Sequence, residues 1–328
     1  MKLTLLGGGG FRVPLMFRTL LADQSDRRVT ELRLWDTDAG RLAVIRSILQ
    51  AMTQGHPKAP KVEVSQNLDE AVAGTDFVFS AIRVGGTEGR ATEETIAHCC
   101  GVLGQETTGF GGLDYALRGI PTAVRIAETI ARLAPGAHLI NFTNPAGIIT
   151  EVSSRILGDR VIGICDSPVG LARRVLDTLE GAGLVATGTA SRVIAGDDRV
   201  RLDYVGLNHL GWLQRLLVDG DDVLPLLLER PDLIESFEEG RLFGAGWLRQ
   251  LGSVPNEYLH YYYFARETRR ADEAVEATRG VFLAAQQRDF YARAATLPGP
   301  EAYALWEATR LRREETYMAS NRLAAGGV

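Results

Sequence analysis

Two residues of this chain, Cys165 and His209, carry side chains that bind borderline-soft divalent metal ions. Cys165 lies in the segment GICDSP at 163–168, and His209 lies in GLNHLGW at 206–212. Taken singly, a cysteine is more often a small buried side chain, and a histidine is more often a hydrogen-bonded structural residue. Two protein ligands leave coordination positions open, as in catalytic metal sites that substrate oxygens complete. On these residues alone, both interpretations stand.

A second feature with chemical meaning is a run of glycines near the N-terminus, Gly7, Gly8, Gly9 and Gly10, followed by Phe11. A glycine-rich turn between a strand and a helix cradles a pyrophosphate. The run departs from the usual G-x-G-x-x-G pattern, so a tight turn without a ligand is the alternative. Asp36 favours a dinucleotide, because an acid at the end of the second strand binds the ribose hydroxyls of NAD and repels the extra phosphate of NADP.

The elements that must position these residues alternate along the first half of the chain. Apolar, β-prone runs predict strands at 2–6, 32–36, 61–64, 76–81, 138–142 and 161–164. Helical patterns fall between them at 13–21, 39–54, 68–73 and 121–133. This alternation predicts an α/β fold with a Rossmann-type doubly wound parallel sheet. Cys165 then follows the carboxyl end of a strand, where such sheets bind ligands.

The second half has a different pattern. Residues 192–194 and 199–205 predict an antiparallel pair around a turn at 196–198, and 212–218 predict another strand. Long helices are expected at 276–292 and 301–317. We therefore predict two domains, an NAD-binding Rossmann domain at 1–165 and a mostly helical α+β domain at 166–328 that binds metal and substrate.

Composition limits the possible partners. The chain has 328 residues, 45% of them hydrophobic and 23% charged, with a formal net charge of −5. It lacks a basic stretch suited to a phosphate backbone, so nucleic acid is not expected as a partner. No apolar run reaches membrane-spanning length, and the N-terminal apolar run is too short for a signal peptide. Three cysteines make no disulfide framework, which predicts a reduced, cytoplasmic protein without a membrane partner.

Other polar segments allow two interpretations each. The amides of Asn141 and Asn144 suit sugar hydroxyls, although asparagine before proline also forms turns. The glycine-rich segment 104–112 is a candidate lid or substrate loop. The tyrosines of 258–263 are candidates for a base or for packing. Arg269-Arg270 is either an anion clamp or a solvated helix end.

Together these segments resemble glycoside hydrolase family 4, the NAD- and metal-dependent glycosidases. The resemblance runs from Met1 to about Tyr317. It rests on the glycine run, IRVGG at 82–86, Arg90, GQETTG at 104–109, FTNPAGIITE at 142–151, GICDSP, GLNHLGW and YLHYYYF at 258–264. The ordered agreement of all these motifs is specific, whereas no single motif is. The family is an exception to the usual mechanism with two carboxylates.

The resemblance implies a fold like that of lactate and malate dehydrogenases, NAD and Mn²⁺ as cofactors, and a phosphorylated glucoside as the small-molecule substrate. It implies these metal ligands and substrate contacts: Cys165 and His209 for Mn²⁺, Asn144 and Asp166 for the sugar, Arg270 for the 6-phosphate, and Arg90 in a substrate loop. The cofactor contacts are expected at Gly7 to Gly10, Phe11, Asp36 and Arg83. The candidate base is Tyr258, with Tyr261 and Tyr262 as alternatives.

The mechanism that the resemblance implies uses NAD without net oxidation. NAD⁺ takes hydride from C3 of the sugar, and the metal polarises the resulting ketone. The C2 proton then becomes acidic enough for a tyrosine base, and 1,2-elimination expels the group at C1. Water adds, and the hydride returns to C3. Stabilisation of the enediolate is expected to contribute most.

The anomer preference is read from small differences. Family members that cleave 6-phospho-β-glucosides commonly have Asn after the cysteine, whereas α-type members often have Asp, interpreted as the general acid. Asp166 therefore favours the α-type, but Ser167 replaces the Met of the α-type CDMP signature. The runs at 258–264 and 110–121 are more like the β-type. We predict a 6-phospho-β-glucosidase, with a 6-phospho-α-glucosidase as the alternative.

Three further expectations stay open. A 2-hydroxy-acid dehydrogenase uses the same fold, but it needs no thiolate ligand such as Cys165. An NAD-sensing binding module would need no metal. The family's interfaces predict a homodimer or homotetramer. The chain reaches Val328 where relatives continue into further helices, so the family's C-terminal part is expected to be missing.

Overall fold

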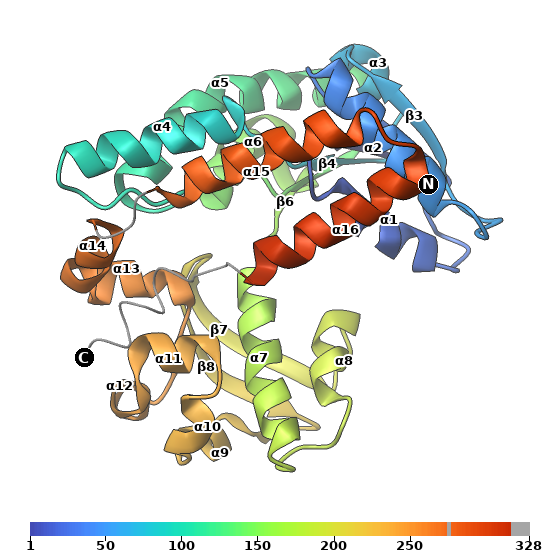
Figure 1. Ribbon diagram of the computed structural model, residues 1–328. Helices are drawn as coiled ribbons and strands as arrows, with labels where there is room; N and C mark the ends of the chain where they lie inside the picture. Colours follow the sequence, from blue (N-terminus) through green and yellow to red (C-terminus); the bar gives the residue numbers. More distant parts are fainter. Residues whose placement is uncertain (274–276, 316–328) are drawn as a thin grey trace. The chain divides into compact units, whose positions relative to one another are not determined.

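The computed structural model describes residues 1–273 and 277–315, and the chain divides into two units. The first unit comprises Met1–Ile164 and the segment that begins at Ala277, and the second unit begins at Cys165 (Figure 1). The predicted division placed everything after residue 165 in the second domain. The structure differs for the segment after Ala277, because Phe290, Ala294 and Trp306 complete the core of the first unit.

A six-stranded parallel sheet forms the centre of the first unit. Its strands are β1 (Lys2–Leu6), β2 (Glu31–Trp35), β3 (Lys61–Ser65), β4 (Phe77–Ser80), β5 (His138–Asn141) and β6 (Val161–Gly163). They lie in the order β3-β2-β1-β4-β5-β6, and all neighbours are parallel. This is the strand order of doubly wound dinucleotide-binding folds, so the predicted Rossmann-type sheet is confirmed.

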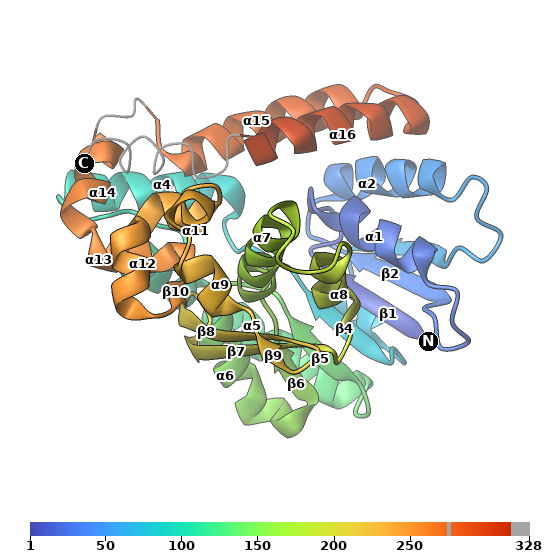
Figure 2. The same cartoon turned by 90° about the horizontal axis from the view of Figure 1, so that it is seen from below.

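Helices cover both faces of this sheet. One core packs the strands β1, β2 and β3 against four helices: α1 (Val13–Ala22), α2 (Ala39–Met52), α15 (Arg279–Ala294) and α16 (Gly299–Glu315). Another core involves α3 (Leu68–Val72), α5 (Gly109–Leu133) and α6 (Ala146–Leu157), which is followed by the short turn η1 (Gly158–Arg160). Figures 1 and 2 show α15 and α16 side by side, with α16 along α2. In the described part of the chain, we find no helix with the length and apolarity needed to cross a membrane.

Helix α4 (Gly86–Cys99) has no counterpart among the expected elements, and α5 begins 12 residues before the helix expected at 121–133. The sequence of α4 is polar and carries no clear apolar stripe. Tertiary contacts stabilise it instead, because it packs along α15, and the backbone N–H of Gly280 donates to Glu94 Oε2 at 2.6 Å. The ends of the predicted helices at 276 and 317 lie outside the described residues, as do the residues up to Val328.

The second unit combines a small antiparallel sheet with many short helices. The sheet order is β10-β8-β7, with β9 paired to β8. The unit contains α7 (Ser167–Gly181), α8 (Thr189–Ala195), β7 (Val200–Leu207), β8 (Leu210–Val218), β9 (Asp221–Asp222), α9 (Leu224–Leu228), α10 (Pro231–Ile234), α11 (Glu238–Phe243), α12 (Ala245–Leu251), β10 (Val254–Pro255), η2 (Glu257–Leu259), α13 (His260–Tyr263) and α14 (Ala265–Glu273). Its core joins α7 to β8 and to the helices that follow. The expected mostly helical second lobe is confirmed.

The strand predicted at 192–194 is wrong, because these residues lie in α8. Their β-branched side chains suggested a strand, but left-handed glycines flank the segment, Gly188 with a φ of 89° and Gly196 with a φ of 67°. Glycine in this conformation ends a short helix at low cost. The antiparallel pair is instead β7 with β8, in which Leu207 faces Leu210. The residues between them, Asn208 and His209, form the tip of a hairpin.

Candidate active site

The glycine run forms the turn between β1 and α1, where neighbouring backbone leaves no room for side chains. Gly7 has a φ of 87°, and a Cβ there would lie 2.6 Å from Ala81 O. A Cβ on Gly8 would lie 2.6 Å from Leu34 Cβ. The N–H groups of Gly7 and Gly8 both donate to Trp35 O, at 2.9 and 2.7 Å. The loop is therefore held against the end of β2, and it leads into the start of α1, a position suited to a phosphate.

Asp36 lies directly against this loop. Its Oδ2 accepts a hydrogen bond from Gly9 N at 3.0 Å, and its Oδ1 accepts one from Asp38 N at 3.1 Å. Phe11, by contrast, has a buried side chain that packs edge-on against Phe290, with ring centroids 5.1 Å apart. The predicted roles of Asp36 and Phe11 in cofactor binding remain predictions, and for Phe11 the backbone is the part that lies in the loop.

Arg83 and Arg90 lie in a network of buried ion pairs. Arg83 donates to Glu106 Oε1 at 2.6 Å and to Glu93 Oε2 at 2.9 Å. Arg90 donates to Glu94 Oε1 at 2.6 Å and to Glu106 Oε2 at 2.5 Å. These contacts fasten α4 to the loop before α5. The predicted contacts of Arg83 with cofactor and of Arg90 with substrate remain predictions, and both arginines have a structural role.

Positive charge accumulates around Glu106. Burial tends to raise the pKa of Glu106, but Arg90 and Arg83, followed by Arg12 and Arg313, lower it overall. Burial and then the like charges of Arg12 and Arg279 lower the pKa of Arg313 to about 10. Sequence spacing gave no sign of this cluster, because its arginines come from segments far apart in the chain. A cluster of guanidinium groups recognises phosphate well.

The segment 104–112 is organised by its own side chains. Gln105 is buried, and its Oε1 accepts hydrogen bonds from Thr107 N at 2.7 Å and from Thr108 N at 3.1 Å. These bonds shape the turn that precedes α5 and present Glu106 to the arginines. The expectation of a lid or substrate loop stays a prediction.

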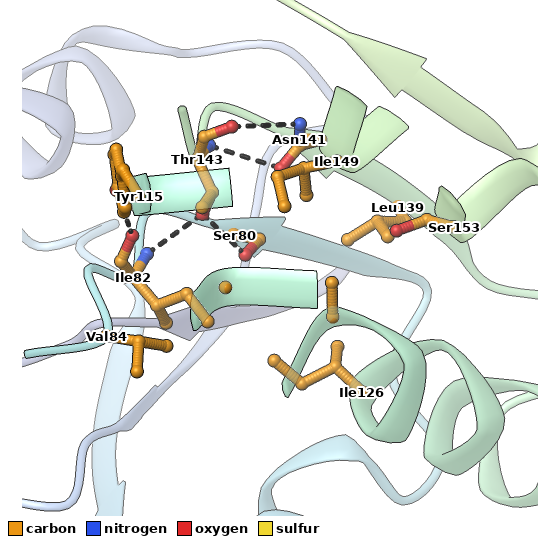
Figure 3. Close-up of a pocket in the computed structure, with 12 residues that line it drawn as sticks. Ser80, Ile82, Val84, Tyr115, Ile126, Leu139, Asn141, Thr143, Ile149 and Ser153 are labelled. Atoms are coloured by element: carbon orange, nitrogen blue, oxygen red, sulfur yellow. Dashed lines mark hydrogen bonds between the residues drawn. The ribbon is translucent and has the colours of Figure 1, made fainter. Parts of the chain in front are cut away.

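Figure 3 shows the polar residues at the ends of β4 and β5. Asn141 donates to Thr143 O at 3.2 Å and accepts from Thr143 N at 3.1 Å, while Thr143 Oγ1 accepts from Ile82 N at 3.1 Å. The cavity beneath them measures about 10 Å³, the size of a single water. Two roles were expected for Asn141, contact with sugar hydroxyls or formation of a turn, and these hydrogen bonds give it the role in the turn. Asn144 lies partly buried in the same turn, and its contact with substrate stays a prediction.

In the second unit, the structure brings together Cys165 and His209, with 3.3 Å between Sγ and Nε2. Cys165 stands just before α7, and His209 lies at the tip of the β7–β8 hairpin. Asn208 adopts a φ of 51°, a conformation that asparagine tolerates, and its carbonyl accepts a hydrogen bond from Tyr204 Oη at 2.6 Å. Both features fix the hairpin tip at Asn208, on the N-terminal side of His209. Asp166 Oδ1 lies 4.0 Å from the sulfur.

The chemistry of this pair fits an open metal site. Burial raises the pKa of the Cys165 thiol to about 11, and the charges of Asp166 and Glu257 act in the same direction. A divalent cation bound to the sulfur would reverse this effect and keep the thiolate. Among residues 1–273 and 277–315, no group of three or more His, Cys, Asp or Glu side chains is placed to hold a metal. Cys165 and His209 would therefore supply two ligands and leave positions for substrate oxygens.

Tyr258 lies against this pair. Its ring stacks on the imidazole of His209, with centroids 3.9 Å apart and planes 8° apart. Asn256 places it, because Asn256 Oδ1 accepts from Tyr258 N at 3.1 Å and Asn256 N donates to Gly211 O at 2.9 Å. Of the alternatives, the Tyr261 ring is 5.9 Å from that of Tyr258, and Tyr262 is 51% exposed. The geometry favours Tyr258 over both alternatives.

Behind Tyr258 lies a buried set of charges that the sequence analysis missed. Glu257 Oε1 accepts a hydrogen bond from Ser167 Oγ at 2.6 Å, and Arg174 lies 3.6 Å from Glu257 Oε2 and pairs with Glu239. Burial, and then the charge of Glu239, raises the pKa of Glu257 to about 7. Glu257 thus connects the start of α7, next to Cys165, with η2. Its position next to Tyr258 in the YLHYYYF run was the one available signal.

Arg270, predicted to take the 6-phosphate, lies on α14 of the second unit and is exposed. Arg90 and Asn144 belong to the first unit. The structure therefore brings together Cys165, His209, Asp166 and Tyr258 in one unit, and the glycine run with Asp36 in the other.

Strand order and glycine loop define the first unit as a dinucleotide-binding α/β domain. The sequence model described as "Family 4 glycosyl hydrolase" matches residues 2–180, and the "Family 4 glycosyl hydrolase C-terminal domain" matches residues 204–325. The chain belongs to glycosyl hydrolase family 4, as its motifs indicated.

Two relatives illustrate the level of similarity. The 6-phospho-beta-glucosidase of Escherichia coli is 30% identical over 282 residues, which cover 81% of this chain and 58% of the relative. The 6-phospho-alpha-glucosidase of Leptotrichia buccalis is 32% identical over 280 residues, which cover 80% and 60%. The chain spans about 60% of the length of the curated relatives it matches.

Solved structures agree with the fold. The 6-phospho-beta glucosidase of Thermotoga maritima, in a structure with manganese, NAD⁺ and glucose-6-phosphate, has a TM-score of 0.77 at 27% identity, covering 95% of this chain and 72% of that chain. Lactate dehydrogenase from Eimeria maxima has a TM-score of 0.52 at 15% identity and covers 81% of this chain and 73% of its own. The latter is a likeness of fold, and it confirms the predicted dehydrogenase-like architecture.

The raised pKa of Glu257 predicts a pH-dependent stability. The folded protein keeps this proton up to about pH 7, whereas an ordinary glutamate has lost it above 4.5. The stabilisation of the folded state by this proton is therefore complete below pH 4.5 and is lost as the pH rises through about 7. In the wild type, the unfolding free energy should therefore fall as the pH rises from about 5 to about 8. In Glu257→Gln this fall should be smaller by about 2 kcal/mol.

Urea unfolding at a series of pH values measures this dependence. Glu235→Gln, a change of an exposed glutamate in the same unit, is the matched control and should keep the wild-type slope. An unchanged slope in Glu257→Gln would show that Glu257 does not bind the proton.

Proposed function

We propose that this protein is a 6-phospho-β-glucosidase that uses NAD and a divalent metal ion, with Mn²⁺ as the expected metal. The observation that supports it most is the contact of 3.3 Å between Cys165 and His209 with Tyr258 stacked on the histidine, in a chain that also has a dinucleotide-binding fold. The named relatives that cleave phosphorylated glucosides support it further. A homodimer or homotetramer remains our expectation for the assembly.

The residues divide between two tasks. The glycine run and the start of α1 would hold the pyrophosphate, and Asp36 would hold the ribose. Cys165 and His209 would bind the metal ion. When bound, the nucleotide supplies a reversible hydride acceptor and the metal supplies a Lewis acid for a carbonyl oxygen.

Tyr258 and Asp166 would carry the proton transfers. The phenolate oxygen of Tyr258 takes the proton from C2, the electron pair of that bond forms a C1–C2 double bond, and the C1–O bond breaks. Asp166 is exposed next to Cys165 and would donate a proton to the leaving oxygen. A general acid there serves either anomer, because C2 deprotonation is what drives bond breaking. The 6-phospho-α-glucosidase therefore stays the alternative.

Turnover of paired nitrophenyl glucoside 6-phosphates tests the function. We expect the β-anomer to be hydrolysed when both Mn²⁺ and NAD⁺ are present, with little release if either is withheld. Substrate deuterated at C2 should react more slowly or exchange with solvent. NADH should not accumulate, since the hydride returns to the sugar.

Each contrary result points elsewhere. Faster release from the α-anomer would favour the α-type enzyme with Asp166 as general acid. Accumulation of NADH with a 2-hydroxy acid would indicate a dehydrogenase. Release without NAD⁺ or metal would overturn the proposal.

Replacement of the thiol tests the metal site. Cys165→Ser should weaken binding of Co²⁺, used as a spectroscopic probe, by more than about 100-fold and abolish the thiolate-to-metal absorption band. NAD⁺ affinity, measured by calorimetry, should stay at the wild-type value. Cys99→Ser, at an exposed cysteine of the first unit, is the matched control and should change neither quantity. An unaltered absorption band in Cys165→Ser would remove this residue from the site.

Arg270 is the candidate for the substrate phosphate, and it lies exposed on α14 in the same unit as Cys165 and His209. Arg270→Ala should raise KM for the phosphorylated glucoside by about 10- to 100-fold, as measured by steady-state kinetics. An equal loss with unphosphorylated glucosides would contradict a phosphate clamp at Arg270.

A further inference from the structure

Two side chains from the last helices of the first unit donate hydrogen bonds into the glycine loop. Tyr291 Oη donates to Gly9 O at 2.5 Å, and Trp306 Nε1 donates to Phe11 O at 2.7 Å. Both donors are buried, with exposed fractions of 9% for Tyr291 and 0% for Trp306. Because each side chain is buried with its polar atom on a carbonyl, loss of either bond leaves a buried polar group without its partner.

Aromatic packing surrounds these two bonds. The Phe11 ring lies edge-on to Phe290 at 5.1 Å and tilted against Trp306 at 6.1 Å. On the other side, the Arg41 guanidinium lies 4.8 Å from the centre of the Tyr291 ring. Helices α2, α15 and α16 thus hold the loop through one continuous cluster.

The planarity of the peptide group transmits this anchoring to the N–H groups. In a trans peptide the C=O of one residue and the N–H of the next point in opposite directions. Fixing Gly9 O therefore fixes the peptide that carries the N–H of Gly10, and this N–H holds the shape of the turn by donating to Gly7 O at 2.8 Å. Fixing Phe11 O likewise directs the N–H of Arg12 away from Trp306, at the start of α1. Backbone N–H groups bind a phosphate well when they are already oriented.

We propose that Tyr291 and Trp306 are positioning residues for the nucleotide, so that NAD⁺ affinity depends on a segment that follows the second unit in the chain. This inference rests on the proposed binding of NAD⁺ at the glycine loop. It adds that residues of α15 and α16, which touch the loop from behind, determine how well the loop receives a phosphate.

Calorimetry with NAD⁺ on the full chain tests the inference. Tyr291→Phe keeps the ring and removes one hydroxyl, and Trp306→Phe removes the indole N–H. Each should weaken NAD⁺ binding by about 5- to 20-fold. Tyr303→Phe is the matched control on α16, because its hydroxyl accepts from Arg18 rather than facing the loop, and it should bind as the wild type does.

Amide hydrogen exchange without nucleotide gives a second readout. Peptides covering 7–13 should exchange faster in Tyr291→Phe, whereas peptides of the β7–β8 hairpin should be unchanged. Wild-type affinity and wild-type exchange in Tyr291→Phe would overturn the inference and leave the proposed function intact. A wild-type protein that binds no NAD⁺ would overturn the proposed function, and the positioning role with it.

Discussion

The contact between Cys165 and His209 is the constraint on which the proposed metal site of the second unit depends. A cysteine before α7 and a histidine at a hairpin tip meet at 3.3 Å because the hairpin loop consists of two residues, with Asn208 in a left-handed conformation. A longer loop would leave the imidazole without a defined direction. Tyr258 stacks on that imidazole, and the same hairpin positions it through Asn256. The proposed base and the proposed histidine ligand are therefore aligned by one piece of antiparallel sheet.

The buried charges behind this site have a physical cost that polar contacts offset. Glu257 and Glu239 are both buried, and Arg174 is the cation between them. Such groups stabilise a structure weakly, but they penalise any packing that separates them. Here they join the start of α7 to η2 through Ser167. The first unit uses the same device, with Glu106 between Arg83 and Arg90. In each unit, paired charges fix segments that lie far apart in the sequence.

The features that could be predicted from the sequence are those with a local signal. The glycine run, the strand that Asp36 follows and the alternation of strands and helices follow from backbone geometry and apolar periodicity, and the structure has them where expected. The strand at 192–194 failed, because β-branching outweighed the flanking glycines in the prediction. Helix α4 was missed, since its stability comes from contacts with α15. Glu257 and Trp306 were missed because a buried acid or a core tryptophan carries no spacing that reveals its partner.

The interrupted course of the first unit affects how the protein is made. Its core needs Trp306 on Phe11, a pairing across 295 positions with Cys165–Glu276 of the second unit in between. On the ribosome, the parallel sheet with α1 and α2 would emerge long before α15 and α16, so Phe11 and the apolar residues of α2 that pack against these helices would stay uncovered meanwhile. Closing so large a loop is entropically costly and slow, although the cost grows only gently with length. Synthesis of the second unit thus sets the delay during which a nascent chain is most exposed to aggregation and to chaperones.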